Sequence, residues 1–133
     1  DLDQKNFNFL AIYGLAGIGK STLALQFAHI FSKNEKNISL WIDAENKEKI
    51  IECYNKILNK DLSKKDYDIE FKKFFCYTLD NSKKNILIVY DNVENAELLK
   101  KQITNLHANT KVIITIRNKD ILFKGIKNYD KLE

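Results

Sequence analysis

Residues 14–21 read Gly-Leu-Ala-Gly-Ile-Gly-Lys-Ser and fit the pattern GxxxxGK[ST]. A loop that binds polyphosphate must bring its backbone N–H groups close to the charged oxygens, and glycine permits that approach. Three of the four glycines in the chain lie within this pattern. Lys20 would add a positive charge near the outer phosphates, and the Ser21 hydroxyl is suited to coordinate Mg²⁺. The pattern predicts a phosphate-binding loop made of Gly14, Leu15, Ala16, Gly17, Ile18, Gly19, Lys20, Ser21 and Thr22.

A second chemical feature is the apolar run at residues 86–90 (ILIVY), which ends in Asp91. A carboxylate at the end of a strand can hold Mg²⁺, directly or through water, on the side opposite Ser21. This is the form of a Walker B motif. Many P-loop ATPases place a second acid at the next position, where this chain has Asn92. An amide can orient water but cannot accept its proton, although Glu94 could act from the loop, so we expect hydrolysis to be slow or absent.

The third feature is Arg117, the only arginine among 22 basic residues. It follows the apolar run at residues 112–116 (VIITI). Arginine gives planar, multidentate recognition of a phosphate that lysine does not reproduce. We therefore predict that Arg117 contacts the outer phosphate from the strand beside the phosphate-loop strand. The alternative is an arginine that serves only in a salt bridge.

Regular elements must position these residues, and the apolar periodicity predicts strands that alternate with helices. Helical spacing of apolar residues appears from residue 20 to about 32, where it involves Leu23, Phe27, Ile30 and Phe31. Further helices are expected at residues 50–58, 66–79 and 96–106. Strands are expected at residues 7–13, 38–43, 86–90 and 112–116, with a fifth from residue 128. This alternation predicts an α/β fold with a parallel sheet and ligands at the carboxyl ends of the strands, marked here by Gly14, Asp43, Asp91 and Arg117.

Length and composition restrict the function further. The 133 residues are expected to form one domain, 1–133, and the absence of methionine predicts a fragment of a larger protein. The net charge of +4 comes from lysines interleaved with acids, so we expect ordinary solvated surfaces and no nucleic-acid binding. No apolar run is long enough for a bilayer, so no membrane partner is expected. Cys53 and Cys76 lack neighbouring metal ligands and are expected to be two buried free thiols in the cytoplasm.

Taken together, four segments resemble the NB-ARC nucleotide-binding domain of STAND-class P-loop NTPases. They are GLAGIGKSTLA (residues 14–24), LWIDAEN (40–46), LIVYDNVEN (87–95) and KVIITIRNKDIL (111–122). The resemblance implies a three-layer α/β/α P-loop NTPase core with strand order 2-3-1-4-5. It also implies ADP or ATP binding with Mg²⁺ and a cytoplasmic signalling switch. Lys20, Asp91 and Arg117 would be the residues of the reaction, and Ser21 and Asp91 would hold the metal.

The resemblance also implies partners and leaves alternatives open. Family members continue into a helical lid, a winged helix and sensor repeats, and nucleotide-dependent self-association is a further expectation. The chain contains no proline, so the Gly-x-Pro turn of such a lid is absent from it. A small-molecule or nucleoside kinase uses the same loop pattern, but it would need more arginines than this chain has. A third possibility is an interaction domain with a vestigial phosphate loop. Enzyme activity, if present, would be a weak ATPase.

Overall fold

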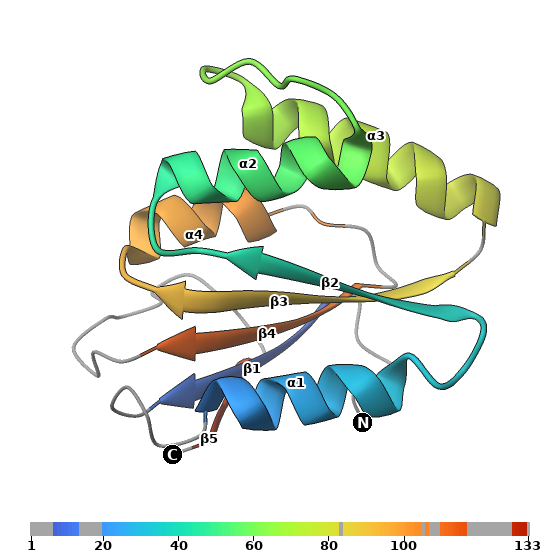
Figure 1. Cartoon of the computed structure of the whole chain (residues 1–133), viewed down its shortest axis with the longest axis vertical. Helices are drawn as coiled ribbons and strands as arrows, with labels where there is room; N and C mark the ends of the chain where they lie inside the picture. The colour runs from blue at the N-terminus through green and yellow to red at the C-terminus, as the bar shows by residue number, and fades with distance from the viewer. Residues whose placement is uncertain are drawn as a thin grey trace.

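The computed structural model of the chain describes residues 7–13, 20–82, 84–104, 106, 110–116 and 129–132. Strands and helices alternate along these residues, and each predicted strand and helix is present with somewhat different ends. In chain order the elements are β1 (Phe7–Tyr13), α1 (Lys20–Phe31), β2 (Asn37–Asp43), α2 (Lys47–Leu58), α3 (Tyr67–Ser82), β3 (Asn85–Val93), α4 (Ala96–Ile103), β4 (Thr110–Ile116) and β5 (Tyr129–Leu132) (Figure 1). The predicted fifth strand is β5.

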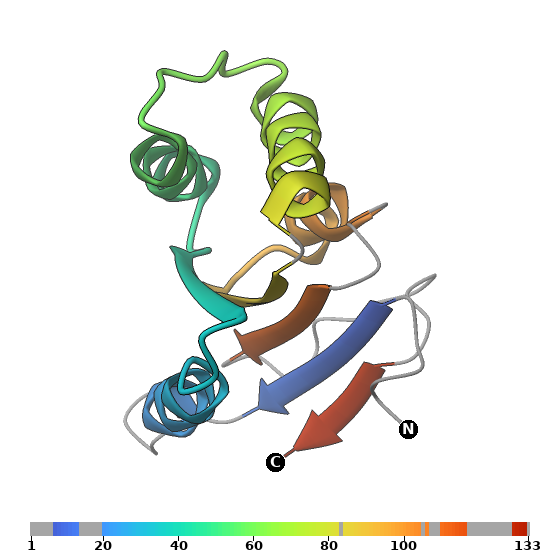
Figure 2. The same ribbon diagram turned by 90° about the vertical axis from the view of Figure 1, so that its right-hand side faces the viewer.

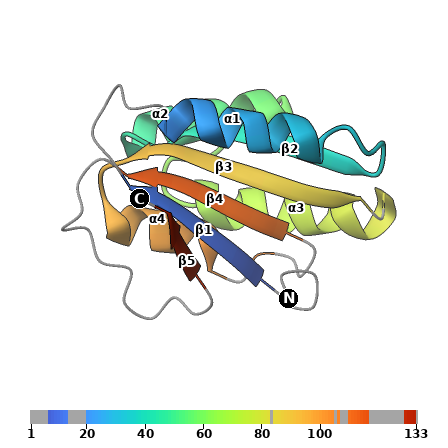
Figure 3. The same cartoon turned by 90° about the horizontal axis from the view of Figure 1, so that it is seen from below.

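The five strands form one parallel sheet in the order β2-β3-β4-β1-β5 (Figure 3). The implied order 2-3-1-4-5 is therefore wrong, because β4 and not β1 is the neighbour of β3. β1 pairs with β4 on one side and with β5 on the other. The apolar run in β4 is buried throughout, as expected for a strand with neighbours on both sides. Such a run identifies a central strand but does not say which strands flank it.

Helices cover both faces of the sheet, which confirms the three-layer α/β/α architecture. α1 lies alone on one face, and α2, α3 and α4 lie on the other (Figures 1 and 2). Two separate clusters of buried apolar residues fill the two interfaces. None of the helices in the described residues combines the length and apolar character that crossing a bilayer requires.

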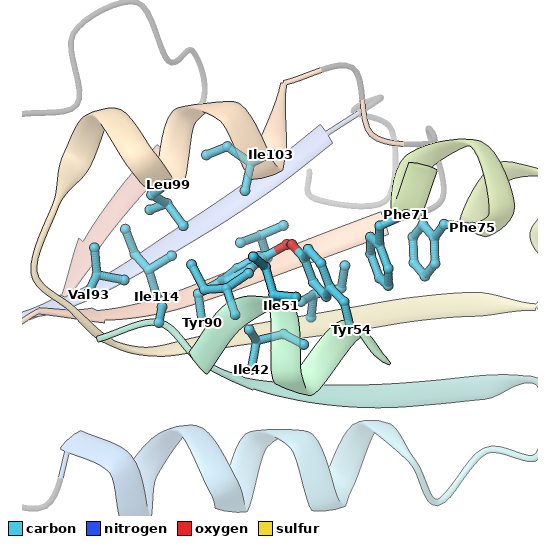
Figure 4. Packing of buried hydrophobic residues seen from close by; sticks show 14 of the residues in the cluster. Ile42, Ile51, Tyr54, Phe71, Phe75, Tyr90, Val93, Leu99, Ile103 and Ile114 are labelled. Carbon is cyan, nitrogen blue, oxygen red and sulfur yellow. The ribbon is translucent and has the colours of Figure 1, made fainter. Parts of the chain in front are cut away.

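The cluster beneath α2, α3 and α4 is rich in aromatic rings (Figure 4). Tyr54 of α2 stacks on Phe71 of α3 with ring centroids 3.7 Å apart, and Phe71 stacks on Phe75 at 5.3 Å. The hydroxyl of Tyr54 lies 2.8 Å from that of Tyr90, which belongs to β3. The fully buried Tyr90 therefore links the sheet to the helical layer immediately before Asp91.

The face beneath α1 is packed differently. Among the side chains of this helix that the structure describes, Ala24 and Ala28 are buried, and they lie against apolar side chains of the sheet. The large apolar residues whose spacing predicts the helix do not form its buried face, because most of them are exposed. The exposed apolar residues of α1 are Leu23, Leu25, Phe27 and Ile30. The two cysteines, predicted to be buried, are free thiols that are each only partly buried.

Candidate functional site

Polar residues lie near the carboxyl ends of three neighbouring strands. Asp43 ends β2, Asp91 lies near the end of β3, and Thr115 lies near the end of β4. Asp43 pairs with Asp91 in the register of β2 and β3. All three strands point the same way, so these residues share one edge of the sheet (Figure 1). Ligands of parallel α/β sheets bind at this edge.

A short hydrogen-bond chain joins Asp91 to β4. The hydroxyl of Thr115 donates to Oδ1 of Asp91 at an O···O distance of 2.6 Å. The same hydroxyl oxygen accepts the backbone N–H of Asn92 at 2.8 Å. Thr115 is fully buried, whereas Asp91 and Asn92 are partly exposed. The carboxylate therefore lies at the boundary between the core and solvent, with a buried donor holding one of its oxygens.

The strand pairing is interrupted at the same place. Regular pairing of β3 with β4 stops at Tyr90 and resumes at Val93. The two residues between them, Asp91 and Asn92, therefore lie opposite the single residue Thr115, which defines a β-bulge. Asn92 has a φ of 64°, in the left-handed region that asparagine adopts more readily than most residues. Bulges of this kind re-aim side chains, and this one lies at the predicted metal-binding acid.

Asp43 has partners of its own at the neighbouring strand end. Its Oδ1 accepts the backbone N–H of Glu45 at 3.2 Å, and its Oδ2 lies 3.7 Å from Nζ of Lys49. Lys49 also contacts Glu45 at 2.7 Å, and this hydrogen bond and the glutamate charge raise the pKa of Lys49. The charge of Asp43 is therefore balanced within the loop and first turn of α2. Asp91 is the strand-end acid that the sequence pattern predicts to bind the metal.

The phosphate-loop residues are divided between described and undescribed parts of the chain. Lys20, Ser21 and Thr22 form the first turn of α1, and Thr22 is exposed. α1 begins on the side to which the strands point (Figure 1). The N-terminus of a helix attracts anions through its free N–H groups and its dipole. Residues 14–19 and Arg117, named as candidate binding and sensor residues, lie outside the described residues.

The donor chemistry of the described edge fits Mg²⁺. This ion prefers oxygen ligands and is usually held by one or two carboxylates or hydroxyls together with phosphate oxygens. Asp91 offers a carboxylate at the sheet edge, and Ser21 is the hydroxyl predicted to act with it. Within the described residues, no group of three or more His, Cys, Asp or Glu side chains is arranged to hold a metal ion.

Thr115 is a site residue that sequence reasoning did not single out. In the sequence it is one hydroxyl residue inside a buried apolar run, with no spacing pattern that links it to Asp91. A signal was present, because a polar residue two positions before Arg117 interrupts an otherwise aliphatic strand. Its role depends on the pairing of β3 with β4, which the implied strand order did not include.

A parallel sheet covered on both faces, with a phosphate-loop pattern between its first strand and first helix, defines the class of P-loop nucleotide-binding proteins. The chain matches the family model of the NB-ARC domain over residues 1–132 and therefore belongs to this family. The resemblance noted in the sequence is thus confirmed. NB-ARC domains are nucleotide-binding signalling modules of multidomain proteins. A search of curated proteins found no match for the chain.

Proposed function

We propose that this chain binds ADP or ATP together with Mg²⁺ and acts as a nucleotide-dependent signalling switch with slow or absent ATP hydrolysis. The observation that carries the proposal is the Asp91 carboxylate, held by Thr115 at the sheet edge where α1 begins. Membership in the NB-ARC family supports nucleotide binding. The residue pattern in the loop between β1 and α1 supports recognition of the phosphates.

Each candidate residue has a distinct role in this proposal. The residue pattern at 14–19 would allow backbone N–H groups to bind the phosphates, and Lys20 would add a positive charge beside them. Ser21 and Asp91 would hold Mg²⁺, and the bound ion would supply positive charge that neutralises the phosphates. Thr22 adds a contact from the first turn of α1. Arg117, two residues after Thr115, contacts the outer phosphate and reports whether it is present.

Slow hydrolysis follows from the residue beside Asp91. Asn92 cannot take a proton from water, and its backbone N–H is already bonded to Thr115. Glu94 is exposed in the loop after β3, two residues beyond Asn92, and is the acid that could act in its place. A site with this composition favours a long-lived bound nucleotide, which is the property that a switch needs. The proposed enzyme activity is accordingly a weak ATPase.

The proposed setting is a larger cytoplasmic STAND protein. The partners in this proposal are nucleotide and the other domains of that protein: a helical lid, a winged helix and sensor repeats. Nucleotide-dependent self-association is the proposed output of the switch. These assignments rest on the family to which the chain belongs.

Calorimetric titration with ADP, ATP and GTP in the presence of Mg²⁺ tests nucleotide binding directly. Lys20→Ala should lower the affinity by about tenfold to a hundredfold, because a charged contact to phosphate is lost. Lys33→Ala is the matched control, since this lysine is exposed just beyond α1 and should leave the affinity unchanged. Absence of binding by the wild-type chain, or equal binding by Lys20→Ala, would contradict the proposal.

Single-turnover ATP hydrolysis tests the second part of the proposal. Asn92→Asp places a proton acceptor beside Asp91, and aspartate tolerates the left-handed backbone better than most residues do. We expect this variant to hydrolyse ATP faster than the wild-type chain. A variant that binds Mg²⁺·ATP normally but gains no rate would show that the missing acid is not what limits hydrolysis.

A further inference from the structure

The Thr115 hydroxyl takes part in two hydrogen bonds, and the direction of each is fixed by its partner. Its hydroxyl has one proton to donate and lone pairs to accept. The backbone N–H of Asn92 can only donate, so the hydroxyl must accept from it and keep its own proton for Asp91. The distances of 2.8 Å and 2.6 Å agree with this polarity. The orientation of the hydroxyl is therefore fixed by the backbone.

This fixed donor limits the freedom of the Asp91 side chain. A partly exposed carboxylate can adopt several orientations, and a hydrogen bond from a buried donor favours one of them. Oδ1 of Asp91 is held by a hydrogen bond to a residue that is fully buried in β4. The same hydroxyl accepts the N–H of Asn92 in the bulge, so one side chain bonds to both the bulged backbone and the carboxylate.

We propose that Thr115 is a positioning residue, which orients the Asp91 carboxylate for Mg²⁺·nucleotide and stabilises the β-bulge that presents it. The inference rests on the proposed function, because it assigns a role toward the metal of that same site. Residues that hydrogen-bond to metal ligands fix the orientation of the ligand and often change metal affinity by 10–100-fold when they are replaced. Thr115 acts through Asp91 and does not itself touch the metal.

The same strand offers a matched control at its other end. Thr110 is also a fully buried threonine of β4. In the part of the chain that the structure describes, its hydroxyl oxygen has no hydrogen-bond partner. Replacing either threonine with valine removes one buried hydroxyl group and keeps the shape of the side chain nearly the same. A difference between the two variants therefore reports the hydrogen bonds of Thr115 and not the loss of a buried hydroxyl in general.

The test measures nucleotide affinity by calorimetry with Mg²⁺ and with EDTA, and takes the ratio of the two as the metal dependence. Thr115→Val should reduce this ratio by about tenfold or more while leaving the affinity in EDTA within about twofold of wild type. Thr110→Val and Thr115→Ser should both keep the wild-type ratio. In an Asp91→Asn background, Thr115→Val should cause no further loss, because the residue acts through the carboxylate.

A second readout needs no nucleotide. Hydrogen exchange of the Asn92 backbone amide should be slow in the wild type and in Thr115→Ser. It should be faster in Thr115→Val than in Thr110→Val. Fast exchange of this amide in the wild-type chain would overturn the inference even if Thr115→Val failed to fold.

The outcomes separate this inference from the proposed function. If the wild-type chain binds no nucleotide, the proposed function fails and the assigned role fails with it. If the wild type shows metal-dependent binding and Thr115→Val keeps the same ratio, only the inference is overturned. A loss of affinity that is equal in Mg²⁺ and EDTA would also overturn it, because that result indicates general damage to the fold.

Discussion

The two faces of the sheet are packed in opposite ways. Beneath α2, α3 and α4, stacked aromatic rings such as Tyr54 and Phe71 fill the interface. Beneath α1, the buried residues among the described side chains of the helix are Ala24 and Ala28. Small side chains let a helix approach a sheet closely. We call the interface beneath α1, where small side chains are buried, the thin layer. We call the interface beneath α2, α3 and α4, which contains most of the buried apolar residues, the thick layer.

The thick layer also contains a buried polar network that the thin layer lacks among the described residues. Tyr54 donates to Oε1 of Gln102 at 3.0 Å, and Nε2 of Gln102 donates to the hydroxyl of Tyr67 at 2.7 Å. Tyr90 joins the network through Tyr54. Burial raises the pKa of Tyr54 and of Tyr90, because the ionised forms would lose their hydration. The network links α2, α3 and α4 to β3 at Tyr90, the residue immediately before Asp91.

The largest expected difference between the layers comes from removing a large side chain. Phe71→Ala should destabilise the protein by about 3–5 kcal/mol, because a fully buried ring stacked between two others is lost and a cavity remains. Phe27→Ala on α1 should cost less than about 1 kcal/mol, because this ring is 43% exposed. Urea unfolding of both variants measures the difference. Equal losses would contradict the division into a thick and a thin layer.

A second difference should appear at alkaline pH. The folded pKa values of Tyr54 and Tyr90 are raised, so both stay protonated in the native state when the unfolded chain ionises near pH 10. Their contribution to stability is complete below about pH 10 and is lost as the pH rises toward the folded values. Above about pH 11 the free energy of unfolding should fall by about 1.4 kcal/mol per pH unit for each tyrosine.

Urea unfolding between about pH 11 and 12, where tyrosines of the unfolded chain are almost fully ionised, measures this slope. Tyr54→Phe should reduce it by about 1.4 kcal/mol per pH unit, since one buried proton no longer contributes. Tyr77→Phe is the matched control, because this side chain is 70% exposed on α3 and stays in contact with water in both states. A Tyr54→Phe variant with the wild-type slope would show that the buried network is not the source of the alkaline loss.

A third prediction concerns the close approach of α1. Ala24→Leu should destabilise the protein by about 1–3 kcal/mol, because the buried methyl group leaves no room for a larger side chain between helix and sheet. Gln26→Leu, at an exposed position of the same helix, should change stability by less than about 0.5 kcal/mol. Thermal or urea unfolding measures both. If Ala24→Leu were stabilising, the thin layer would contain a space that leucine fills.

Much of the fold could be predicted because its signals are local. The uninterrupted apolar runs of β3 and β4 identify buried strands, and the helical spacing of apolar residues identifies α2 and α3. The predicted phosphate loop at residues 14–19 lies outside the described residues and stays a prediction. Strand order was wrong because it depends on pairing between distant segments. The buried stripe of α1 was not apparent either, since periodicity weights large residues such as Phe27 over Ala24. The role of Thr115 was not predicted for the same reason as the strand order, because its partner Asp91 belongs to a different strand.

The smallest expected effect is the sharpest test of the thin layer. Ile30 is 67% exposed near the end of α1, whereas Ile50 of α2 is 1% exposed. Ile30→Gln should change stability by less than about 0.5 kcal/mol, because glutamine is a good helix former and little apolar surface returns to water. Ile50→Gln should cost several times more, since it buries an amide in the aromatic layer. A loss above about 1 kcal/mol for Ile30→Gln would mean that the outer side of α1 is covered in the folded chain.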